Sequence, residues 1–274
     1  MLPELPPRTE RVQLVPLSAG EQELYDTARL AVLGRVQSGA SDARIELLAA
    51  LTRLRRLVCH PRLYDPGSAL SSSKLDALLE ILGELGDEGR RALVFSQFTS
   101  FLEIVRAAVD RAGIPALYLD GSTPVTERRK RVEAFQRGEA DLFLISLKAG
   151  GTGLNLTAAD CVVHLDPWWN PAVEDQATDR AHRIGQENPV TVIRLVAAGT
   201  IEELVLDLHG EKRALAQGVF DGTDAGARLS HDDLVQLLEH GLSNLAPGDA
   251  PVPPRKTARR RSRKSRSNPA SRTP

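Results

Sequence analysis

Hydrophobic and polar residues in the first part of the chain alternate briefly and then recur at helical spacing. The stretch ERVQLVPL (10–17) alternates enough for a short strand, and apolar residues after it repeat at helical spacing from Ser18 and again over about 42–58. Ser18 and Glu21 form an S-x-x-E capping box, which is typical of a helix N-terminus. This part of the sequence therefore predicts one strand followed by two helices.

From residue 71 onward, short apolar runs alternate with longer segments of helical spacing. The expected strands are ALVF (92–95), ALYLD (116–120), DLFLIS (141–146), CVVHLD (161–166) and VTVIRLV (190–196). The expected helices cover 71–86, 98–113, 124–136, 171–185 and 200–218. Strands that alternate with helices in this way are typical of βα units around a mainly parallel sheet whose two faces are both covered. We therefore predict an α/β fold.

The C-terminal part of the chain differs in composition from the rest. A last helix is expected at 229–241, with Ser230 as its cap, and the Pro/Arg/Ser-rich segment after it is expected to be disordered. Residues 251–274 contain nine Lys and Arg and no acidic residue, whereas the rest of the chain carries 26 bases and 36 acids. The body is therefore acidic, and contacts with nucleic acid must come from local placement of basic residues or from the tail.

Several classes of protein are excluded by the residues that are rare or scattered. The two cysteines, Cys59 and Cys161, have no CxxC spacing, which argues against a disulfide framework or a zinc site and fits a reducing cytosol. The start MLPELPPRTE lacks the features of a secretory signal, and no apolar run reaches the roughly 18 residues of a membrane span. The six histidines form no HExxH-like cluster, and no G-x-S-x-G is present. We expect a cytoplasmic protein, nucleoid-associated in a bacterium, that is not secreted, does not cross a membrane and holds no metal of its own.

Loops with unusual composition follow the expected strands, and ligands of parallel α/β sheets gather at such strand ends. In SLKAGGTGLNLT (146–157), Gly150, Gly151 and Gly153 allow backbone amides to approach an anion where a Cβ would clash, although a tight turn explains them equally well. DPWWNP (166–171) holds both tryptophans, as a packed corner or as a platform for nucleic acid. DGST (120–123) and SQF (96–98) suit either anion binding or helix capping.

The stretch DQATDRAHRIGQ (175–186) places Arg180 and Arg183 three residues apart on one face of an expected helix. Asp179 lies four residues before Arg183, so a solvated ion pair is one explanation of that arginine. Arg180 has Gln176, not an acid, at the same spacing. The arginines together with the anion-friendly loops indicate a binding site for an anion.

The order of these motifs resembles the second RecA-like lobe of the Swi/Snf-type DNA-dependent ATPases of helicase superfamily two. The matching stretches are LRRLVCHPRLY (54–64), SSSKLDALLEIL (71–82), ALVFSQFTSFLEIV (92–105), YLDGSTPVTERRKRVEAF (118–135), LISLKAGGTGLNLTAADCVVHLDPWWNP (144–171), EDQATDRAHRIGQENPVTVIRLV (174–196) and TIEEL (200–204). The resemblance implies a RecA-like three-layer α/β/α lobe. Its implied divisions are an inter-lobe strand and helical segment (1–70), the helicase C-terminal lobe (71–222), a C-terminal helix (223–246) and a disordered basic tail (247–274).

The resemblance also implies roles for individual residues. ATP with Mg would lie between two lobes, and Arg180 and Arg183 would contact its γ-phosphate as arginine fingers, with Gln176 beside them. Gly151, Gly153 and Asn155 match a loop that senses the nucleotide. Ser96, Gln97, Ser146 and Lys148 match positions near the DNA backbone, and Trp168 matches a segment that couples ATP to DNA. The implied partners are a first RecA-like lobe, in cis or in trans, and double-stranded DNA bound through its backbone without sequence specificity.

The sequence departs from the family in carrying no G-x-x-x-x-G-K-[ST] loop, and its one Asp-Glu pair, Asp87–Glu88, lies in a glycine-flanked loop. Without a phosphate-binding loop and a magnesium carboxylate, this chain carries half of an ATPase site and is expected to be inactive alone. The residues leave two other readings open. The chain is either a non-catalytic module that binds DNA or protein through the lobe surface and the basic tail, or a truncated remnant.

Overall fold

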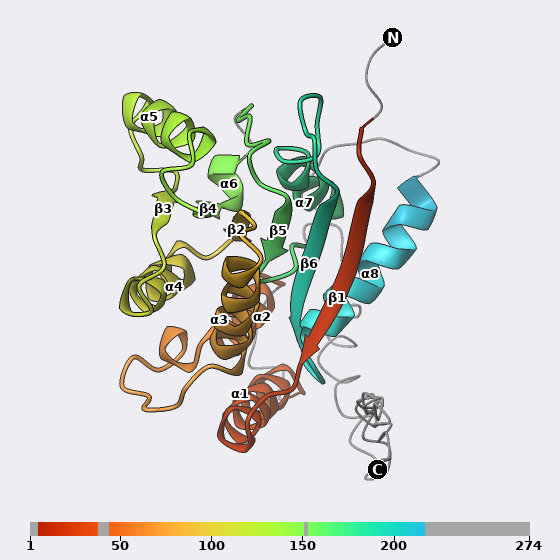
Figure 1. Ribbon diagram of the computed structural model, residues 1–274. Coiled ribbons are helices and arrows are strands. Elements are labelled where there is room, and N and C mark those ends of the chain that lie inside the picture. Colours follow the sequence, from red (N-terminus) through yellow and green to blue (C-terminus); the bar gives the residue numbers. More distant parts are fainter. Residues whose placement is uncertain (1–4, 38–43, 151–152, 217–274) are drawn as a thin grey trace, which may run out of the picture. The chain divides into compact units, whose positions relative to one another are not determined.

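The computed structural model describes residues 5–37, 44–150 and 153–216 (Figure 1). The strands are β1 (Arg8–Val15), β2 (Ala92–Ser96), β3 (Ala116–Leu119), β4 (Leu142–Ser146), β5 (Cys161–His164) and β6 (Val190–Ala197). The helices are α1 (Ala19–Gln37), α2 (Arg44–Cys59), the 3₁₀ helix η1 (Pro61–Leu63), α3 (Ser73–Asp87), α4 (Thr99–Arg111), α5 (Val125–Gln136), α6 (Leu147–Gly150), α7 (Pro171–Thr178) and α8 (Ile201–Ala216). The helix expected at 229–241 and the basic tail lie outside the described residues.

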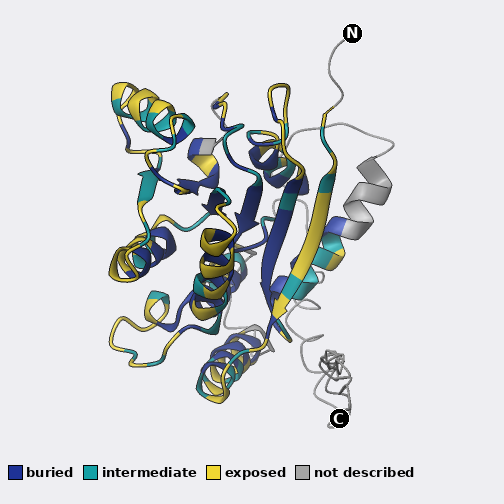
Figure 2. Ribbon diagram, viewed as in Figure 1, coloured by how far each residue is buried: buried dark blue, intermediate teal, exposed yellow. Residues whose placement is uncertain are grey.

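The described strands form one six-stranded sheet in the order β1-β6-β5-β2-β4-β3, and every neighbouring pair is parallel. The central strand β2 is buried along its whole length, as an apolar run between two covered faces should be (Figure 2). β1 is an edge strand, begins two residues before the stretch expected from the sequence, and pairs with β6 from Arg8 opposite Val190 onward. The predicted α/β fold with a parallel sheet is confirmed.

Successive residues of β2 face opposite layers, which explains why its whole sequence is apolar. Val94 belongs to a core with Leu78 of α3 and Phe101 of α4, and Phe95 belongs to a second core with Phe135 of α5. Each of these side chains is almost completely buried, and such burial stabilises the fold by about 1.5–3 kcal/mol per large apolar side chain. The sheet is thus the middle of three layers.

A third apolar cluster joins α1, α2 and α8 near the end of β6. It includes four buried leucines at helical spacing on α2: Leu47, Leu51, Leu54 and Leu57. The capping box expected at the start of α1 is present, because Ser18 N donates to Glu21 Oε2 at 2.9 Å. Glu21 Oε1 also accepts a hydrogen bond from Ser73 N at 3.0 Å, which ties the start of α1 to the start of α3. None of the described helices is both long and apolar enough to cross a membrane.

The helix expected over 171–185 is shorter than predicted, which corrects the sequence analysis. α7 ends at Thr178, and residues 179–183 form consecutive turns in which His182 N donates to Thr178 O at 3.1 Å. The carbonyl of Arg180 accepts from Leu156 N at 2.9 Å, so a neighbouring segment satisfies a backbone group that helix continuation would have used. Arg180 and Arg183 therefore lie on a turn and not on a helix face.

Candidate functional site

The two arginines predicted to bind an anion lie on residues 179–183, here called the arginine turn. This turn packs against the glycine-rich connection between β4 and β5. Arg183 Nη1 donates to Leu154 O at 3.3 Å, and Leu156 N donates to the Arg180 carbonyl. The structure thus brings together two segments that the sequence analysis had assigned to one anion-binding site.

Within the described part of the chain, no carboxylate forms an ion pair with Arg180 or Arg183. The ion pair considered between Asp179 and Arg183 is not formed, because Asp179 Oδ1 lies 3.6 Å from Arg8 Nη1. Arg180 Nε is buried and has no hydrogen-bond partner among the described residues. Partial burial, and then the neighbouring charge of Arg183, lower the pKa of Arg180. An anion placed here would supply the missing partner and relieve this repulsion.

The other residues assigned to nucleotide binding are spread around this turn. Gln176 on α7 and Asn155 in the connection are exposed. Gly153 has φ 61°, a conformation that residues with a Cβ rarely adopt. A Cβ on Gly153 would meet no protein atom within 4 Å, so within the described structure the constraint on this residue is its backbone conformation. Gly151 lies outside the described residues.

A second group of predicted residues lies at the carboxyl ends of β2 and β5. Ser96 is fully buried and its hydroxyl donates to Asp166 Oδ1, while Gln97 N donates to Asp166 Oδ2 at 3.2 Å. Burial raises the pKa of Asp166, against the lowering effect of Arg55. The Ser96 hydroxyl is therefore engaged inside the lobe, and Gln97 is the partly exposed side chain at this strand end.

Residues 166–171, here called the tryptophan turn, hold both tryptophans. Arg55 of α2, which is only 1% exposed, joins the end of β2 to this turn. Its Nη1 donates to Gln97 Oε1 at 3.3 Å, and its Nη2 donates to the Pro167 carbonyl. The guanidinium carbon lies 5.1 Å from the ring centroid of Trp169. Desolvation lowers the pKa of Arg55 because burial disfavours its charged form. The surrounding carboxylates and the Pro167 carbonyl stabilise that charged form.

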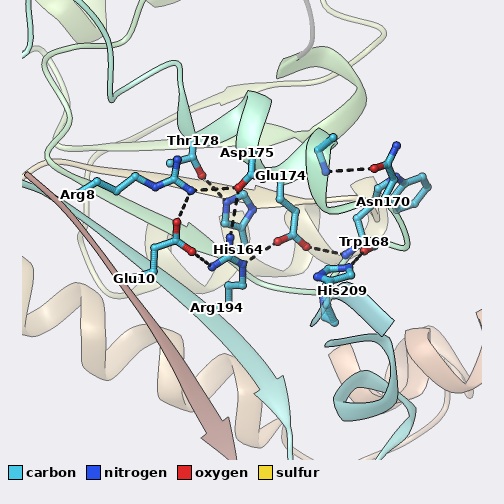
Figure 3. Close-up of polar contacts among 12 residues, drawn as sticks. Arg8, Glu10, His164, Trp168, Asn170, Glu174, Asp175, Thr178, Arg194 and His209 are labelled. Atoms are coloured by element: carbon cyan, nitrogen blue, oxygen red, sulfur yellow. Dashed lines mark hydrogen bonds and ion pairs between the residues drawn. The ribbon is translucent and has the colours of Figure 1, made fainter. Parts of the chain in front are cut away.

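Trp168 is partly buried against the core beneath α7, and its backbone is fixed on both sides (Figure 3). Trp168 N donates to Glu174 Oε1 at 2.7 Å, and the ring nitrogen Nε2 of His209 contacts the Trp168 carbonyl. Both tryptophans are partly exposed. This is compatible with both alternatives of the sequence analysis, a packed corner and a platform for nucleic acid.

Glu174 connects the tryptophan turn to the sheet through Arg194 of β6 (Figure 3). Its Oε2 accepts from Arg194 Nε at 2.8 Å, and Arg194 Nη1 lies 2.6 Å from Glu10 Oε2. Burial acts to raise the pKa of Glu174, but His164 and Arg194 hold it below its usual value. α7 is therefore fixed to β1 and β6 by a charged network with little exposure to water.

Ser146 and Lys148 follow the carboxyl end of β4. Ser146 is buried, and its Oγ accepts from Ala149 N at 3.3 Å, which caps the short helix α6. Lys148 on the same helix is exposed. Of these two residues, Lys148 is the one whose side chain is available to a phosphate in the described structure.

The helix that leads to the arginine turn begins near the carboxyl ends of the strands, as expected, but the turn itself lies at the other end of this helix. α7 begins just after the carboxyl end of β5, but the arginines follow its far end, about 12 Å further along at the helical rise of 1.5 Å per residue. There they contact Leu154 and Leu156, which precede β5. The lobe therefore presents two separate candidate surfaces.

Three residues of these surfaces were missed by the sequence analysis: Arg8, Arg55 and Arg194. A signal for Arg55 was present, because it lies four residues after Leu51 and four before Cys59, both completely buried. Its spacing therefore placed it on the inner face of α2. Arg8 and Arg194 carried no such signal, since their partners lie far away in the sequence.

No group of three His, Cys, Asp or Glu side chains within the described ranges is arranged to hold a metal ion. We assign none of the described residues to the role of magnesium ligand.

The parallel sheet, its three layers and the arginine turn define a RecA-like helicase C-terminal domain, and residues 73–185 match the family described as helicase conserved C-terminal domain. Among solved structures, the C-terminal domain of the Sulfolobus solfataricus SWI2/SNF2 ATPase has a TM-score of 0.69 at 28% identity, over 85% of this chain and 98% of that one. The ATPase core from the same organism in complex with dsDNA has a TM-score of 0.71 at 29% identity, over 85% of this chain and 50% of that one.

A human relative, the SWI/SNF-related matrix-associated actin-dependent regulator of chromatin subfamily A member 1, is 33% identical over 259 residues. The match covers 88% of this chain and 25% of the human protein. The chain therefore belongs to the SWI2/SNF2 family, in which it corresponds to the C-terminal lobe of the ATPase. It spans about a quarter of the length of the curated relatives that it matches.

Proposed function

We propose that this lobe completes the active site of a DNA-dependent ATPase by supplying Arg180 and Arg183 to the γ-phosphate of ATP. The observation that carries this proposal is the unsatisfied charge of the arginine turn. Neither arginine has a carboxylate partner within the described residues, and Arg180 Nε is buried without a hydrogen bond there. Guanidinium groups of this kind stabilise the charge that develops on phosphoryl oxygens during transfer.

ATP would be held mainly by a first RecA-like lobe, in cis or in trans, because the sequence contains no G-x-x-x-x-G-K-[ST] loop. When bound, the nucleotide supplies the phosphoryl group and its Mg. The residues of this chain orient that group and neutralise charge on it. Leu154 O and the backbone bond between Leu156 and Arg180 hold the arginines in position. In this proposal the lobe alone does not turn over ATP.

The second surface, with Gln97, Lys148 and Trp168, is proposed to contact the backbone of double-stranded DNA. A solved relative, the Sulfolobus solfataricus SWI2/SNF2 ATPase core, is in complex with dsDNA, which supports this assignment. An exposed lysine, an amide and a partly exposed aromatic ring are side chains suited to contact phosphate and sugar. Such contacts do not depend on the base sequence. Ser96 and Ser146 would act through the loops that they stabilise.

The proposal is tested in the assembled ATPase, meaning this chain together with a first lobe that carries a Walker A loop. Arg183→Ala should lower DNA-stimulated phosphate release by about 10³-fold or more, as loss of an arginine finger does. Arg129→Ala is the matched control, because Arg129 is exposed on α5 and pairs with Glu133. Turnover of the Arg183→Ala enzyme at the level of the control would contradict the proposal.

A further inference from the structure

The segment that leads into β1 also contacts the arginine turn. The Pro6 carbonyl accepts from His182 Nε2 at 2.8 Å. Arg8 Nη2 donates to Asp175 Oδ1 at 3.1 Å (Figure 3). Arg8 Nη1 lies 3.6 Å from Asp179 Oδ1. Residues 6–8 thus contact the turn at two points, one on each side of Arg180.

The contact with Asp179 has an electrostatic consequence for Arg183. Asp179 and Glu187 each lie four residues from Arg183 and are the nearest carboxylates in sequence, and Asp179 is the one that belongs to the arginine turn. Asp179 instead lies against Arg8, and Arg183 directs its Nη1 to the Leu154 carbonyl. An ion pair with Asp179 would compete with any phosphate for the Arg183 guanidinium, so the placement of Asp179 keeps this cation available.

Arg8 is held firmly enough to exert this effect. It stands opposite Val190 in the parallel pairing of β1 with β6, and Val190 N donates to the Pro7 carbonyl at 3.0 Å. Its side chain is 19% exposed, and its Nη2 also lies 2.5 Å from Glu10 Oε1. Glu10 in turn pairs with Arg194, which is 6% exposed. The cation that holds Asp179 is therefore anchored on the sheet.

We propose that Arg8 is a positioning residue for the arginine fingers, which withholds Asp179 from Arg183 and, with the Pro6 carbonyl, fixes the arginine turn. This inference rests on the proposed function of Arg180 and Arg183. It makes the alignment of the arginines depend on the segment that precedes β1. Displacement of that segment would release Asp179 to Arg183 and switch off the contact with the γ-phosphate.

The first test is hydrogen–deuterium exchange on the chain itself, which needs neither ATP nor a first lobe. Arg8→Gln should speed exchange of the amides in the arginine turn, such as Ala181 and His182, and leave those of β2 unchanged. Arg11→Gln is the matched control, because Arg11 is an exposed residue of the same strand. Unchanged exchange of the turn in Arg8→Gln would overturn the proposal.

The second test measures kcat of the assembled ATPase. Arg8→Gln should lower kcat by about tenfold, because small misplacements of catalytic groups have effects of this size or larger. Arg8→Lys should retain most of the activity, since a lysine still attracts Asp179. Arg8→Gln combined with Asp179→Asn should recover activity relative to Arg8→Gln alone, because Asp179 then no longer competes for Arg183. A merely structural role of Arg8 would give no such recovery.

The results separate this inference from the proposed function. If Arg183→Ala abolishes turnover while Arg8→Gln changes neither kcat nor exchange, only the positioning role is wrong. A double variant no better than Arg8→Gln also overturns it. If Arg183→Ala leaves turnover intact, the proposed function has failed, and the positioning role fails with it.

Discussion

Arg55 lies over the ring of Trp169, with its guanidinium carbon 5.1 Å from the ring centroid, and also donates to Gln97 and to the Pro167 carbonyl. One buried cation thus joins α2 to two loops of the proposed DNA surface. Arg55 is also the largest of the opposite charges that act on buried Asp166, so its removal weakens the stabilisation of that carboxylate.

We therefore predict that Arg55→Met destabilises the chain by about 1–3 kcal/mol in urea unfolding, because it leaves the Pro167 carbonyl and Gln97 Oε1 without their donor. Arg53→Met, at an exposed position of the same helix, should change stability by less than about 0.5 kcal/mol. The chain contains two tryptophans, both in this turn, so Arg55→Met should also shift their fluorescence to longer wavelength. Equal stability of the two variants would contradict this prediction.

His164 gives the stability of the lobe a pH dependence. It is completely buried, stacks on Phe95 and contacts Thr178 Oγ1 through Nε2 at 3.0 Å. Burial lowers its pKa to about 4, from a usual value of 6.5. The folded state therefore favours the neutral ring, and its contribution is fully present above pH 6.5 and is lost as the pH falls toward 4.

From this shift we predict that wild-type stability falls between pH 7 and pH 4 by about 3 kcal/mol more than that of His164→Gln. Urea unfolding of both proteins across this range measures the difference, in which the titration of groups that do not interact with His164 cancels. Parallel pH profiles for the two proteins would show that His164 is not held neutral.

Gly153 in the glycine-rich connection should resist substitution because of its backbone conformation, not because of crowding. With φ 61° and no atom within 4 Å of an added Cβ, Gly153→Ala should cost about 1 kcal/mol or more, whereas Gly153→Asn should cost less. Gly121→Ala, at an open position with ordinary φ, is the matched control and should be nearly neutral. Urea unfolding of the three variants provides the measurement, and equal losses for Ala at both positions would refute the argument.

Lys148 should contribute one phosphate contact to DNA binding. Lys148→Gln should weaken binding of duplexes of any sequence and reduce the slope of log affinity against log salt by about 1. Lys130→Gln is the control, because Lys130 is exposed on α5 and pairs with Glu127. Titration of labelled duplexes at several salt concentrations decides the matter, and an unchanged salt slope in Lys148→Gln would remove this residue from the proposed surface.

The sequence predicted the sheet well because each strand is a short apolar run between turns, and burial on both faces of a parallel sheet requires that pattern. It failed at the end of α7. Apolar residues such as Ala177 and Ala181 keep helical spacing through this region, but the bond from Leu156 N to the Arg180 carbonyl replaces helix continuation. No local pattern reveals a partner that lies elsewhere in the chain.

The candidate site shows the same division between local and distant determinants. Arg180 and Arg183 were identified from their spacing and from the family resemblance, whereas the pairing of Asp179 with Arg8 depends on the parallel alignment of β1 with β6. Spacing alone allowed a pair between Asp179 and Arg183, because the sequence shows local neighbours and not the competing Arg8, which is distant along the chain.

The central claim is that the arginine turn contacts the γ-phosphate, and the most direct measurement compares two nucleotides in the assembled ATPase. Dissociation constants for a non-hydrolysable ATP analogue and for ADP are measured in the wild type and in Arg180→Ala/Arg183→Ala. The account predicts that the double variant binds the analogue more weakly and ADP with unchanged affinity, so that the preference for the triphosphate is lost. An equal loss for both nucleotides, or no loss for either, would contradict it.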